Sequence, residues 1–245
     1  MSKSTREPQF DPTTVAAVVF DIGGVFLYPQ YRAVEAKLVE LVIERPDHIV
    51  AYRRAHHAGV LALTSAVLSQ GGVGDEASGD VWAHYDHAYA TSLGAPRADR
   101  DQLRVAMRHA WDWRHDANVA AFHRLAAAGL PVAIVSNNDG TAATQMRDHG
   151  VCQVGPGPLP SVAAIVDSAI VGASKPDPAI FVPALDALGV EPARVLYVGD
   201  TVHADVHGAT NAGMQVVQLD PFDHHAHFGH ARAEDLDEVA DAITT

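Results

Sequence analysis

The sequence predicts an α/β protein: a doubly wound parallel sheet with a helical insert placed directly after the first strand. Two observations support this fold class. Short runs rich in Val and Ile are apolar on consecutive residues, which is typical of parallel strands buried on both faces. Helical patterns separate several of these runs, and strands alternating with helices form doubly wound sheets. The runs cover residues 14–20, 131–135, 194–198 and 215–219, and a further strand or strand-turn is expected at 162–171.

Start and stop residues support three helices of the predicted core. Residues 117–129 are rich in Ala and end in Gly, which is typical of a helix C-terminus. Residues 177–189 begin with Asp-Pro and also end in Gly. Pro183 lies inside this second pattern and is expected to kink the helix. A third, shorter helix is expected at 204–213.

Residues 31–116 differ from the rest of the chain because they contain no convincing strand pattern. Leu, Val, Ala, Trp and His recur there at helix-like spacings, and a Gly-rich break at 71–79 divides the segment. We expect roughly four helices in this insert. The predicted α/β core is then made of residues 11–30 and 117–245.

Composition narrows the class of protein and its partners. The chain has 245 residues and a formal net charge of −13, which argues against nucleic acid or an anionic membrane as the main partner. No apolar stretch is long enough to span a bilayer, and residues 1–12 lack the apolar region of a secretory signal. The single cysteine, Cys152, excludes an intrachain disulfide and fits a reducing compartment. We therefore expect a cytoplasmic protein, as a monomer or homodimer.

Polar residues follow three of the predicted strands where each strand ends. Asp21 follows the first, Ser136 and Asn137 the second, and Gly199-Asp200 the third, whose loop continues to Asp205. Ligands of open parallel sheets bind beyond these carboxyl ends. Two carboxylates that meet there need a cation or a shared proton, and Mg²⁺ suits such oxygen ligands. Any one of these aspartates alone would be an ordinary helix cap or turn residue, as we expect for Asp220.

Lys175 is one of only three lysines in the chain, and it lies in Ser-Lys-Pro-Asp-Pro (174–178) just before a predicted helix. An ammonium there could neutralise both a carboxylate nucleophile and a bound phosphoryl oxygen. The ordinary alternative is a solvated surface lysine.

Together these segments resemble the four motifs of the haloacid dehalogenase-like (HAD) hydrolase superfamily, in the family's order. Phe-Asp-Ile-Gly-Gly-Val (20–25) is similar to the first motif and Val-Ser-Asn (135–137) to the second. Ser-Lys-Pro-Asp-Pro is similar to the third, and Gly-Asp-Thr-Val-His-Ala-Asp (199–205) to the fourth. The resemblance covers nearly the whole chain from about residue 14 onward. It implies a Rossmann-like HAD core, with the insert as a type C1 cap.

The resemblance also implies a Mg²⁺-dependent phosphatase acting on a small phosphorylated metabolite. Asp21 would attack phosphorus and form an aspartyl-phosphate. Ser136, Asn137 and Lys175 would bind the phosphoryl group. Mg²⁺ would be bound by Asp21, the backbone carbonyl of Gly23 and Asp200, with Asp205 in support.

Gly23 is the departure from the family pattern, because most phosphatases of this superfamily have a second Asp there as general acid/base. That help is typically worth about 10²–10⁴ in rate. An anomeric or acyl phosphate would need less protonation of its leaving group. Alternatively, a histidine of the insert could supply the proton, and the candidates are His56, His57, His84 and His87.

Three other interpretations remain open. A phosphate-binding protein without turnover is one alternative. A dehalogenase is another, although dehalogenases of this superfamily generally lack the acidic fourth motif that Asp200 and Asp205 supply. A phosphonatase would need a cap lysine, and Lys37 falls early for that role.

Two groups of side chains have both a structural and a functional interpretation. The aromatic residues of the insert could line a substrate pocket or pack its core: Trp82, Tyr85, Trp111 and Trp113. The histidines at the C-terminal end could bind zinc, but the stretch favours a surface loop without a specific site: His224, His225, His227 and His230.

Overall fold

The computed structural model describes residues 10–70, 79–107 and 111–244, and it confirms the α/β class. Its centre is a parallel six-stranded sheet of order β10-β9-β8-β1-β4-β7. The first strand, β1, lies between β8 and β4, with Val19 opposite Tyr197 and Ala133. The strands are β1 (Ala17–Phe20), β4 (Val132–Ser136), β7 (Ile165–Asp167), β8 (Val195–Gly199), β9 (Gln215–Leu219) and β10 (Arg232–Ala233).

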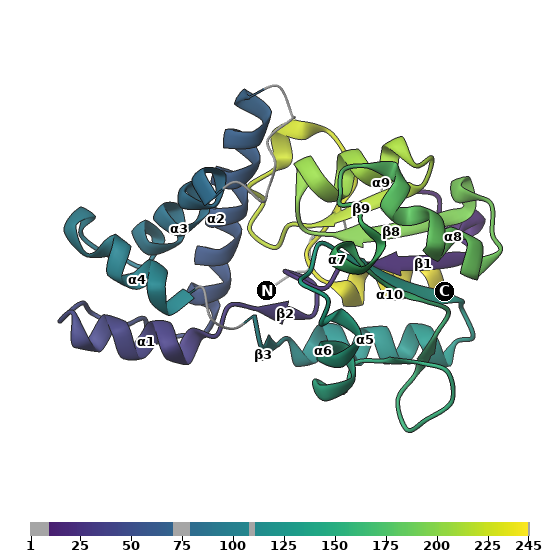
Figure 1. The fold of residues 1–245 in the computed structure, drawn as a ribbon, viewed down its shortest axis with the longest axis horizontal. Helices are drawn as coiled ribbons and strands as arrows, with labels where there is room; N and C mark the ends of the chain where they lie inside the picture. Colours follow the sequence, from purple (N-terminus) through teal and green to yellow (C-terminus); the bar gives the residue numbers. More distant parts are fainter. Residues whose placement is uncertain (1–9, 71–78, 108–110, 245) are drawn as a thin grey trace.

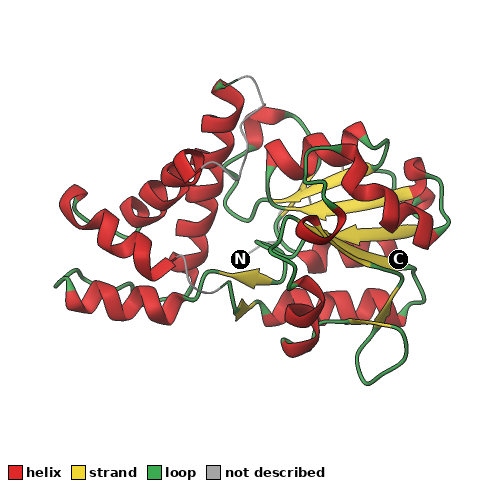
Figure 2. Cartoon of the chain, in the orientation of Figure 1, coloured by secondary structure: helices red, strands yellow, loops and turns green. Residues whose placement is uncertain are grey.

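Helices cover both faces of this sheet (Figures 1 and 2), which explains why its strands are apolar on consecutive residues. Val18 and Phe20 of β1 pack into a cluster with α5 (Asp116–Ala127), α6 (Ala142–Asp148) and α10 (Leu236–Thr244). Ala17 and Val19 face the opposite cluster, with α8 (Val182–Leu188) and α9 (His207–Asn211). Alternate side chains of one strand therefore serve two different cores.

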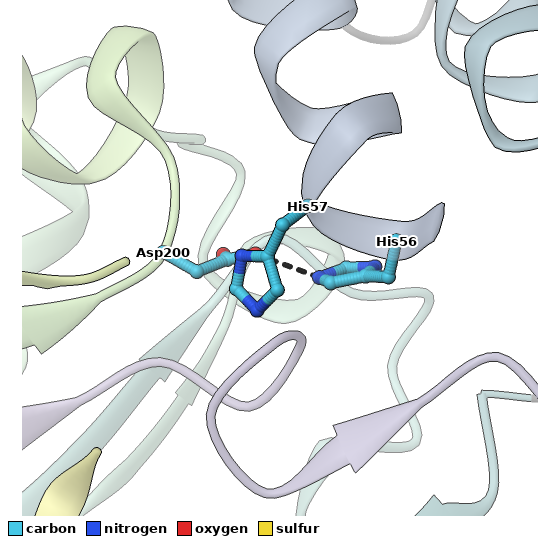
Figure 3. Close-up of side chains that lie close together, drawn as sticks. All are labelled: His56, His57 and Asp200. Carbon is cyan, nitrogen blue, oxygen red and sulfur yellow. Dashed lines mark hydrogen bonds and ion pairs between the residues drawn. The ribbon is translucent and has the colours of Figure 1, made fainter. Parts of the chain in front are cut away.

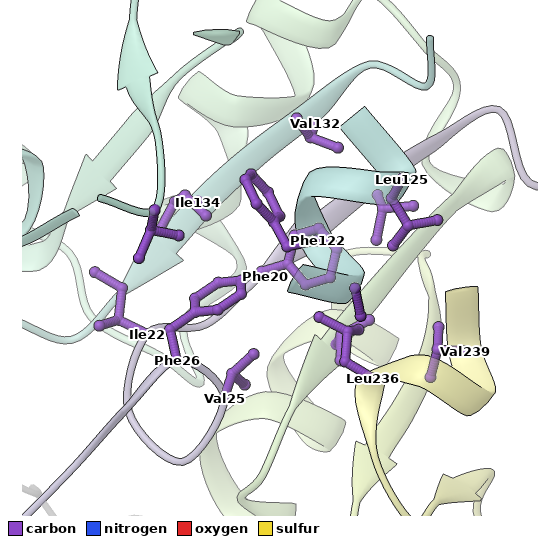
Figure 4. Close-up of a cluster of buried hydrophobic side chains, with 14 of the residues drawn as sticks. Phe20, Ile22, Val25, Phe26, Phe122, Leu125, Val132, Ile134, Leu236 and Val239 are labelled. Carbon is purple, nitrogen blue, oxygen red and sulfur yellow. The ribbon is translucent and has the colours of Figure 1, made fainter. Parts of the chain in front are cut away.

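Three phenylalanines pack against one another at the end of β1, as Figure 4 shows. The ring centroids of Phe20, Phe26 and Phe122 lie 5.3–5.6 Å apart, in tilted and edge-to-face arrangements. Phe20 and Phe26 flank the loop that holds Asp21 and the two glycines. The cluster thus fixes both ends of that loop against α5.

Four helices of the insert form a second unit beside the sheet, on the left in Figure 1, which we call the α1–α4 layer. They are α1 (Tyr31–Glu40), α2 (Val50–Ser69), α3 (Gly79–Ser92) and α4 (Arg100–Met107). The layer has a hydrophobic cluster of its own, which includes Tyr52, Leu63, Tyr89 and Leu103. The described part of the insert is therefore mainly helical.

The segment 31–116, whose sequence shows no convincing strand pattern, contains a short strand near its end. The short strand β3 (Trp113–Arg114) pairs antiparallel with β2 (Leu27–Tyr28), so the chain leaves and re-enters the core along one ribbon. A two-residue strand is too short to produce a periodic pattern in the sequence. A second small pair, β5 (Gln153–Val154) with β6 (Ser161–Val162), follows α6.

Two predicted helices are more irregular than expected. The segment 177–189 begins as a 3₁₀ turn and continues as α8, with Pro183 in its first turn, so the proline begins an element instead of kinking one. The segment 204–213 is a π-helical turn, Val202–Val206, followed by α9. The segment 162–171 holds β7 and the short α7 (Ser168–Val171). The 3₁₀ turns are Pro12–Thr14, Arg97–Asp99, Pro178–Phe181, Pro192–Arg194 and Ala226–Phe228.

Two expectations from composition can be compared with the structure. Cys152 is fully buried, and burial raises the pKa of its thiol to about 12, so it packs as a small apolar side chain. Among the helices of the described residues, none combines the length and apolar character that a membrane crossing requires.

Candidate active site at the carboxyl edge of the sheet

The three central strands bring the predicted polar residues to one edge. Asp21 follows β1, Ser136 ends β4 and Asp200 follows β8, and β1 pairs with both neighbours. The backbone N–H of Asp21 donates to the carbonyl of Val198 at 2.9 Å, which continues the ladder past the strand end. Asp21, Gly23, Ser136, Asn137, Lys175 and Asp200 all line one cavity of about 370 Å³.

Lys175 is buried in this site, so the surface-lysine alternative is wrong. Its Nζ lies 2.9 Å from Asp21 Oδ1 and 2.7 Å from Asp205 Oδ1, and 3.0 Å from the Tyr197 hydroxyl. Burial lowers the pKa of the ammonium, but the two carboxylates outweigh burial and hold that pKa above its usual range. Asn137 fixes the backbone, because its amide exchanges two hydrogen bonds with the N–H and carbonyl of Lys175.

Asp205 anchors the lysine and does not line the cavity. Its Oδ1 accepts from Lys175 Nζ and, at 2.8 Å, from the Tyr197 hydroxyl. Its Oδ2 accepts from the backbone N–H of Asp200 and from the N–H and hydroxyl of Thr201. Burial would raise the pKa of this carboxyl, but Lys175 and the Thr201 donors hold it below its usual value. All its oxygens are thus engaged by groups of the protein.

Gly199 explains how Asp205 reaches this position. A Cβ at Gly199 would lie only 2.4 Å from Asp205 Cγ, so a side chain there would collide with the carboxylate. The π-helical turn after Thr201 carries Asp205 back toward the strand end.

Asp21 and Asp200 carry an unfavourable charge in the absence of a further cation. Burial is the largest cause and raises the pKa of Asp21 to about 7, with Lys175 opposing it. Burial and the nearby Asp205 raise the pKa of Asp200 to about 8. One oxygen from each of Asp21, Asp200 and Asp205 lies within 4.8 Å of the others. Buried, mutually repelling carboxylates with oxygen donors fit a hard divalent cation such as Mg²⁺.

The structure favours glycine at the two positions after Asp21 for different reasons, which are steric and conformational. Gly24 has a φ of +65°, and a Cβ there would lie 2.1 Å from Asp200 Oδ2. Gly23 lies beside an aromatic ring: a Cβ built at this position would lie 3.1 Å from Cζ3 of Trp111. Trp111 therefore occupies the space into which a longer side chain at position 23 would extend. The sequence offered no signal for this pairing.

His56 reaches from α2 into the site, as Figure 3 shows. Its Nε2 lies 2.9 Å from Asp200 Oδ2 and its Nδ1 lies 2.8 Å from the Tyr85 hydroxyl. When Asp200 is ionised it only accepts, so in that state Nε2 donates to Asp200 and the Tyr85 hydroxyl donates to Nδ1. Burial, reinforced by Arg53, lowers the pKa of His56 to about 3. Gly59 leaves room for the Tyr85 ring, since a Cβ there would lie 2.6 Å from it.

The other candidate histidines of the insert lack the hydrogen bond to Asp200 that His56 makes, among the described residues. His57 is buried beside His56, and neither ring nitrogen has a hydrogen-bond partner among the described residues. Burial, with His56 and Arg53, holds its pKa well below the ordinary value. His84 and His87 are exposed on α3, outside the cavity lining.

The C-terminal histidines pack individually instead of converging. His225 is buried against Asp220, and His230 Nε2 lies 2.6 Å from Gln218 Oε1. The residue groups that could hold a metal among the described residues lie elsewhere: His56, His57 and Asp200, and Asp21, Asp200 and Asp205. The segment 224–230 is thus loop structure around a 3₁₀ turn.

Sequence reasoning missed two contributors to the site. Tyr197 lies inside β8, where its hydroxyl bonds Asp205, and the sequence signal for it was an aromatic residue with a polar tip inside a buried strand. Thr201 acts through hydrogen bonds that only the folded chain creates. Tyr85 was expected to line a pocket or pack the core of the insert; it lines the cavity, and its hydrogen bond to His56 was not foreseen.

Replacing His56 with Ala is expected to lower the free energy of unfolding by roughly 1–3 kcal/mol, because Asp200 and Tyr85 lose their buried partner. Urea unfolding followed by far-UV circular dichroism measures the difference. His84→Ala, at an exposed position of the same layer, is the control and is expected to stay within about 0.5 kcal/mol of wild type. Equal losses in both variants would contradict a stabilising Tyr85–His56–Asp200 chain.

Comparison with known proteins identifies matches over short segments of curated relatives. A glyceraldehyde 3-phosphate phosphatase from Methanopyrus kandleri is 44% identical over 55 residues, which are 22% of this chain and 24% of that protein. A phosphoserine phosphatase from Thermus thermophilus is 42% identical over 67 residues, which are 27% of each protein. The chain thus aligns with about a quarter of the length of these relatives.

A structural match and a family-model match cover much more of the chain than these short sequence matches do. The putative HAD-hydrolase YfnB from Bacillus subtilis has a TM-score of 0.58 at 17% identity, covering 94% of this chain and 99% of that one. The family model for haloacid dehalogenase-like hydrolases matches residues 15–213, a range that holds Asp21, Ser136, Lys175 and Asp200. The chain therefore belongs to the haloacid dehalogenase-like hydrolase family.

Proposed function

We propose that this protein is a Mg²⁺-dependent phosphohydrolase that acts on a small phosphorylated metabolite through an aspartyl-phosphate on Asp21. The observation that carries the proposal is the position of Asp21. Its carboxylate lies in the cavity, 2.9 Å from the buried Lys175 ammonium and beside the second acid, Asp200. The phosphatase names of the relatives support the same reaction class.

Each side chain has a role in the proposed reaction. An Asp21 oxygen forms a bond to phosphorus while the P–O bond to the leaving group breaks and its electron pair stays on that oxygen. Water then attacks phosphorus, the P–O bond to Asp21 breaks with its electron pair returning to the carboxylate, and the released phosphate keeps the protons of the water. Ser136, Asn137 and Lys175 bind the phosphoryl group, since all three line the cavity around Asp21. The lysine balances charge on the phosphoryl oxygens.

Asp21, Asp200 and the backbone carbonyl of Gly23 would hold Mg²⁺, which supplies positive charge to the phosphoryl oxygens when bound. Asp205 supports this site indirectly. Its two oxygens already accept five hydrogen bonds from Lys175, Tyr197, Asp200 and Thr201. We therefore assign it to positioning the lysine and the Asp200 loop.

The α1–α4 layer acts as a cap in this proposal. Val60 and Leu63 of α2 and Trp82 and Tyr85 of α3 line the same cavity as the core residues. A cavity of about 370 Å³ closed by a second layer favours a small metabolite over a folded phosphoprotein.

The rival functions have less support. For a phosphonatase, the candidate Lys37 forms an ion pair with Glu40 on α1 and does not line the cavity. For a dehalogenase, the buried pair Asp21 and Asp200 is the counter-argument, because two mutually repelling carboxylates fit a divalent cation that a metal-free reaction does not use. A phosphate-binding protein without turnover is separated from the enzyme by the experiment below.

Asp21→Asn is expected to reduce kcat for phosphate-ester hydrolysis by roughly 10³-fold or more, because the amide cannot form the covalent intermediate. A panel of metabolite phosphates and p-nitrophenyl phosphate, assayed with Mg²⁺, measures this. Asp186→Asn removes an exposed carboxylate of α8 and is the matched control, with unchanged kcat expected. Tight binding of a phosphorylated ligand without Asp21-dependent turnover would overturn the hydrolase proposal.

The cation-free protein is expected to lose stability as pH rises from about 4 to 8. The folded-state pKa values of Asp21 and Asp200, about 7 and about 8, lie above an unfolded value of about 4. The folded state therefore binds more protons than the unfolded state across that window, so stability falls with rising pH.

Asp200→Asn tests the origin of this loss. With EDTA at pH 8 the variant is expected to be more stable than wild type by roughly 1–3 kcal/mol, because a repelled buried charge is gone. The variant should also lose most of the stabilisation that MgCl₂ gives to wild type. Thermal unfolding at pH 6 and pH 8, with EDTA or MgCl₂, measures both effects. A wild-type midpoint indifferent to MgCl₂ at pH 8 would contradict the proposed cation site.

A further inference from the structure

The leaving-group side of the cavity has no evident proton donor at the position next to Asp21. Gly23 has no side chain, and Trp111 fills the space beside it, 3.1 Å from where its Cβ would be. A side chain at position 23 therefore requires the indole to shift by a few tenths of an ångström. The packing of the site thus disfavours an acid there.

Three buried groups with exchangeable protons beside this cavity are held by other groups of the protein, among the residues the structure describes. His56 Nε2 bonds Asp200 and the Tyr85 hydroxyl bonds His56. The Lys175 ammonium is held by Asp21 and Asp205. Asp139, at the edge of the cavity, is exposed, and its Oδ1 accepts from the hydroxyl and N–H of Thr141. The three buried donors are thus already engaged, and none of them lies next to Asp21 in the way a side chain at position 23 would.

The wall that the insert contributes to the cavity is aromatic and apolar. Trp82, Tyr85 and Trp111 contact one another, with ring centroids 5.3–6.3 Å apart, and Val60 and Leu63 extend the wall. Lys175 is the only Lys or Arg among the described lining residues, whereas Asp21, Asp139 and Asp200 also line the cavity. A second anionic group on the substrate that lies against the aromatic wall would lose water without gaining a counter-ion.

This inference rests on the proposed function: we propose that the substrate is a phosphate ester or anhydride whose leaving group is weakly basic and carries no second anionic group. Aryl, enol, anomeric and acyl phosphates have this chemistry. When the P–O bond breaks, the electron pair stays on the leaving oxygen, which departs as an anion and takes its proton from water afterwards. A strongly basic alkoxide would need a proton during bond cleavage, and general acid help of that kind is worth about 10²–10⁴ in rate.

Leaving-group dependence of wild-type kcat/KM tests the first half of this proposal. Phenyl phosphate and benzyl phosphate have similar shapes, but the leaving group of benzyl phosphate is a far stronger base. We expect kcat/KM for benzyl phosphate to be lower by about 10²–10⁴. A series of substituted phenyl phosphates is expected to give a steep dependence on phenol pKa. A flat series, with equal rates for phenyl and benzyl phosphate, would overturn the proposal and leave the hydrolase function intact.

A comparison of neutral and anionic leaving-group substituents tests the second half of the proposal, the absence of a second anionic group. We expect 4-carbamoylphenyl phosphate to be hydrolysed with at least about tenfold higher kcat/KM than 4-carboxyphenyl phosphate, because a carboxylate finds no counter-ion in the aromatic wall. A preference for the carboxylate would overturn the inference that the leaving group carries no second anionic group. Failure to hydrolyse any aryl phosphate in an Asp21-dependent way would overturn the proposed function, and this inference with it.

Paired variants assign the effect to the Gly23–Trp111 contact. Gly23→Asp with Trp111→Ala is expected to flatten the leaving-group dependence, because an acid then has room beside the departing oxygen. Trp111→Ala alone should retain the steep dependence, and Gly23→Asp alone should not flatten it. A flattened dependence in Trp111→Ala alone would contradict the assignment to position 23. The wild-type series decides the main proposal even where the double variant does not fold.

Discussion

The buried ammonium of Lys175, held between Asp21 and Asp205, is the interaction on which the rest of the site depends. Three carboxylates and one ammonium meet where water is largely excluded, and the positive charge is insufficient to balance them. Removing one member of such a buried group leaves an uncompensated charge, which is far more costly than losing a surface ion pair. The remaining negative charge makes the site receptive to a divalent cation, and a cation-bound site receptive to phosphate.

This cluster also explains why backbone features that are unfavourable by themselves are retained. Gly24 adopts a left-handed conformation, Gly199 leaves space for Asp205, and a π-helical turn carries Asp205 back to the strand end. Each lets a carboxylate approach the lysine closely. Tyr197 completes the arrangement from inside β8, because its hydroxyl lies within hydrogen-bonding distance of both Lys175 and Asp205. Irregular backbone at these positions thus allows the charges to converge.

Most of the sheet and the position of the site were predictable from local pattern. Consecutive apolar residues followed by Asp21, Ser136 or Asp200 indicate strands buried on both faces and a polar carboxyl edge. The short strands β3 and β10 carry no period that a sequence window can detect. The contacts of His56 with Asp200 and of Trp111 with Gly23 join residues distant in the chain, so only the folded arrangement of the α1–α4 layer and the core reveals them.

The Gly23–Trp111 contact links the insert to the chemistry of the core. Trp111 lies just before β3, on the strand-forming segment that returns the chain to the core beside β2. The same ring contacts His56, Tyr85 and Trp82, so it is packed by the α1–α4 layer while it covers the glycine after Asp21. An acid at position 23 would press against this aromatic packing, because the ring would have to give way to its Cβ. The packing of the insert thus bears directly on the first loop, and under the proposed function it would influence both the shape of the leaving group and the proton available to it.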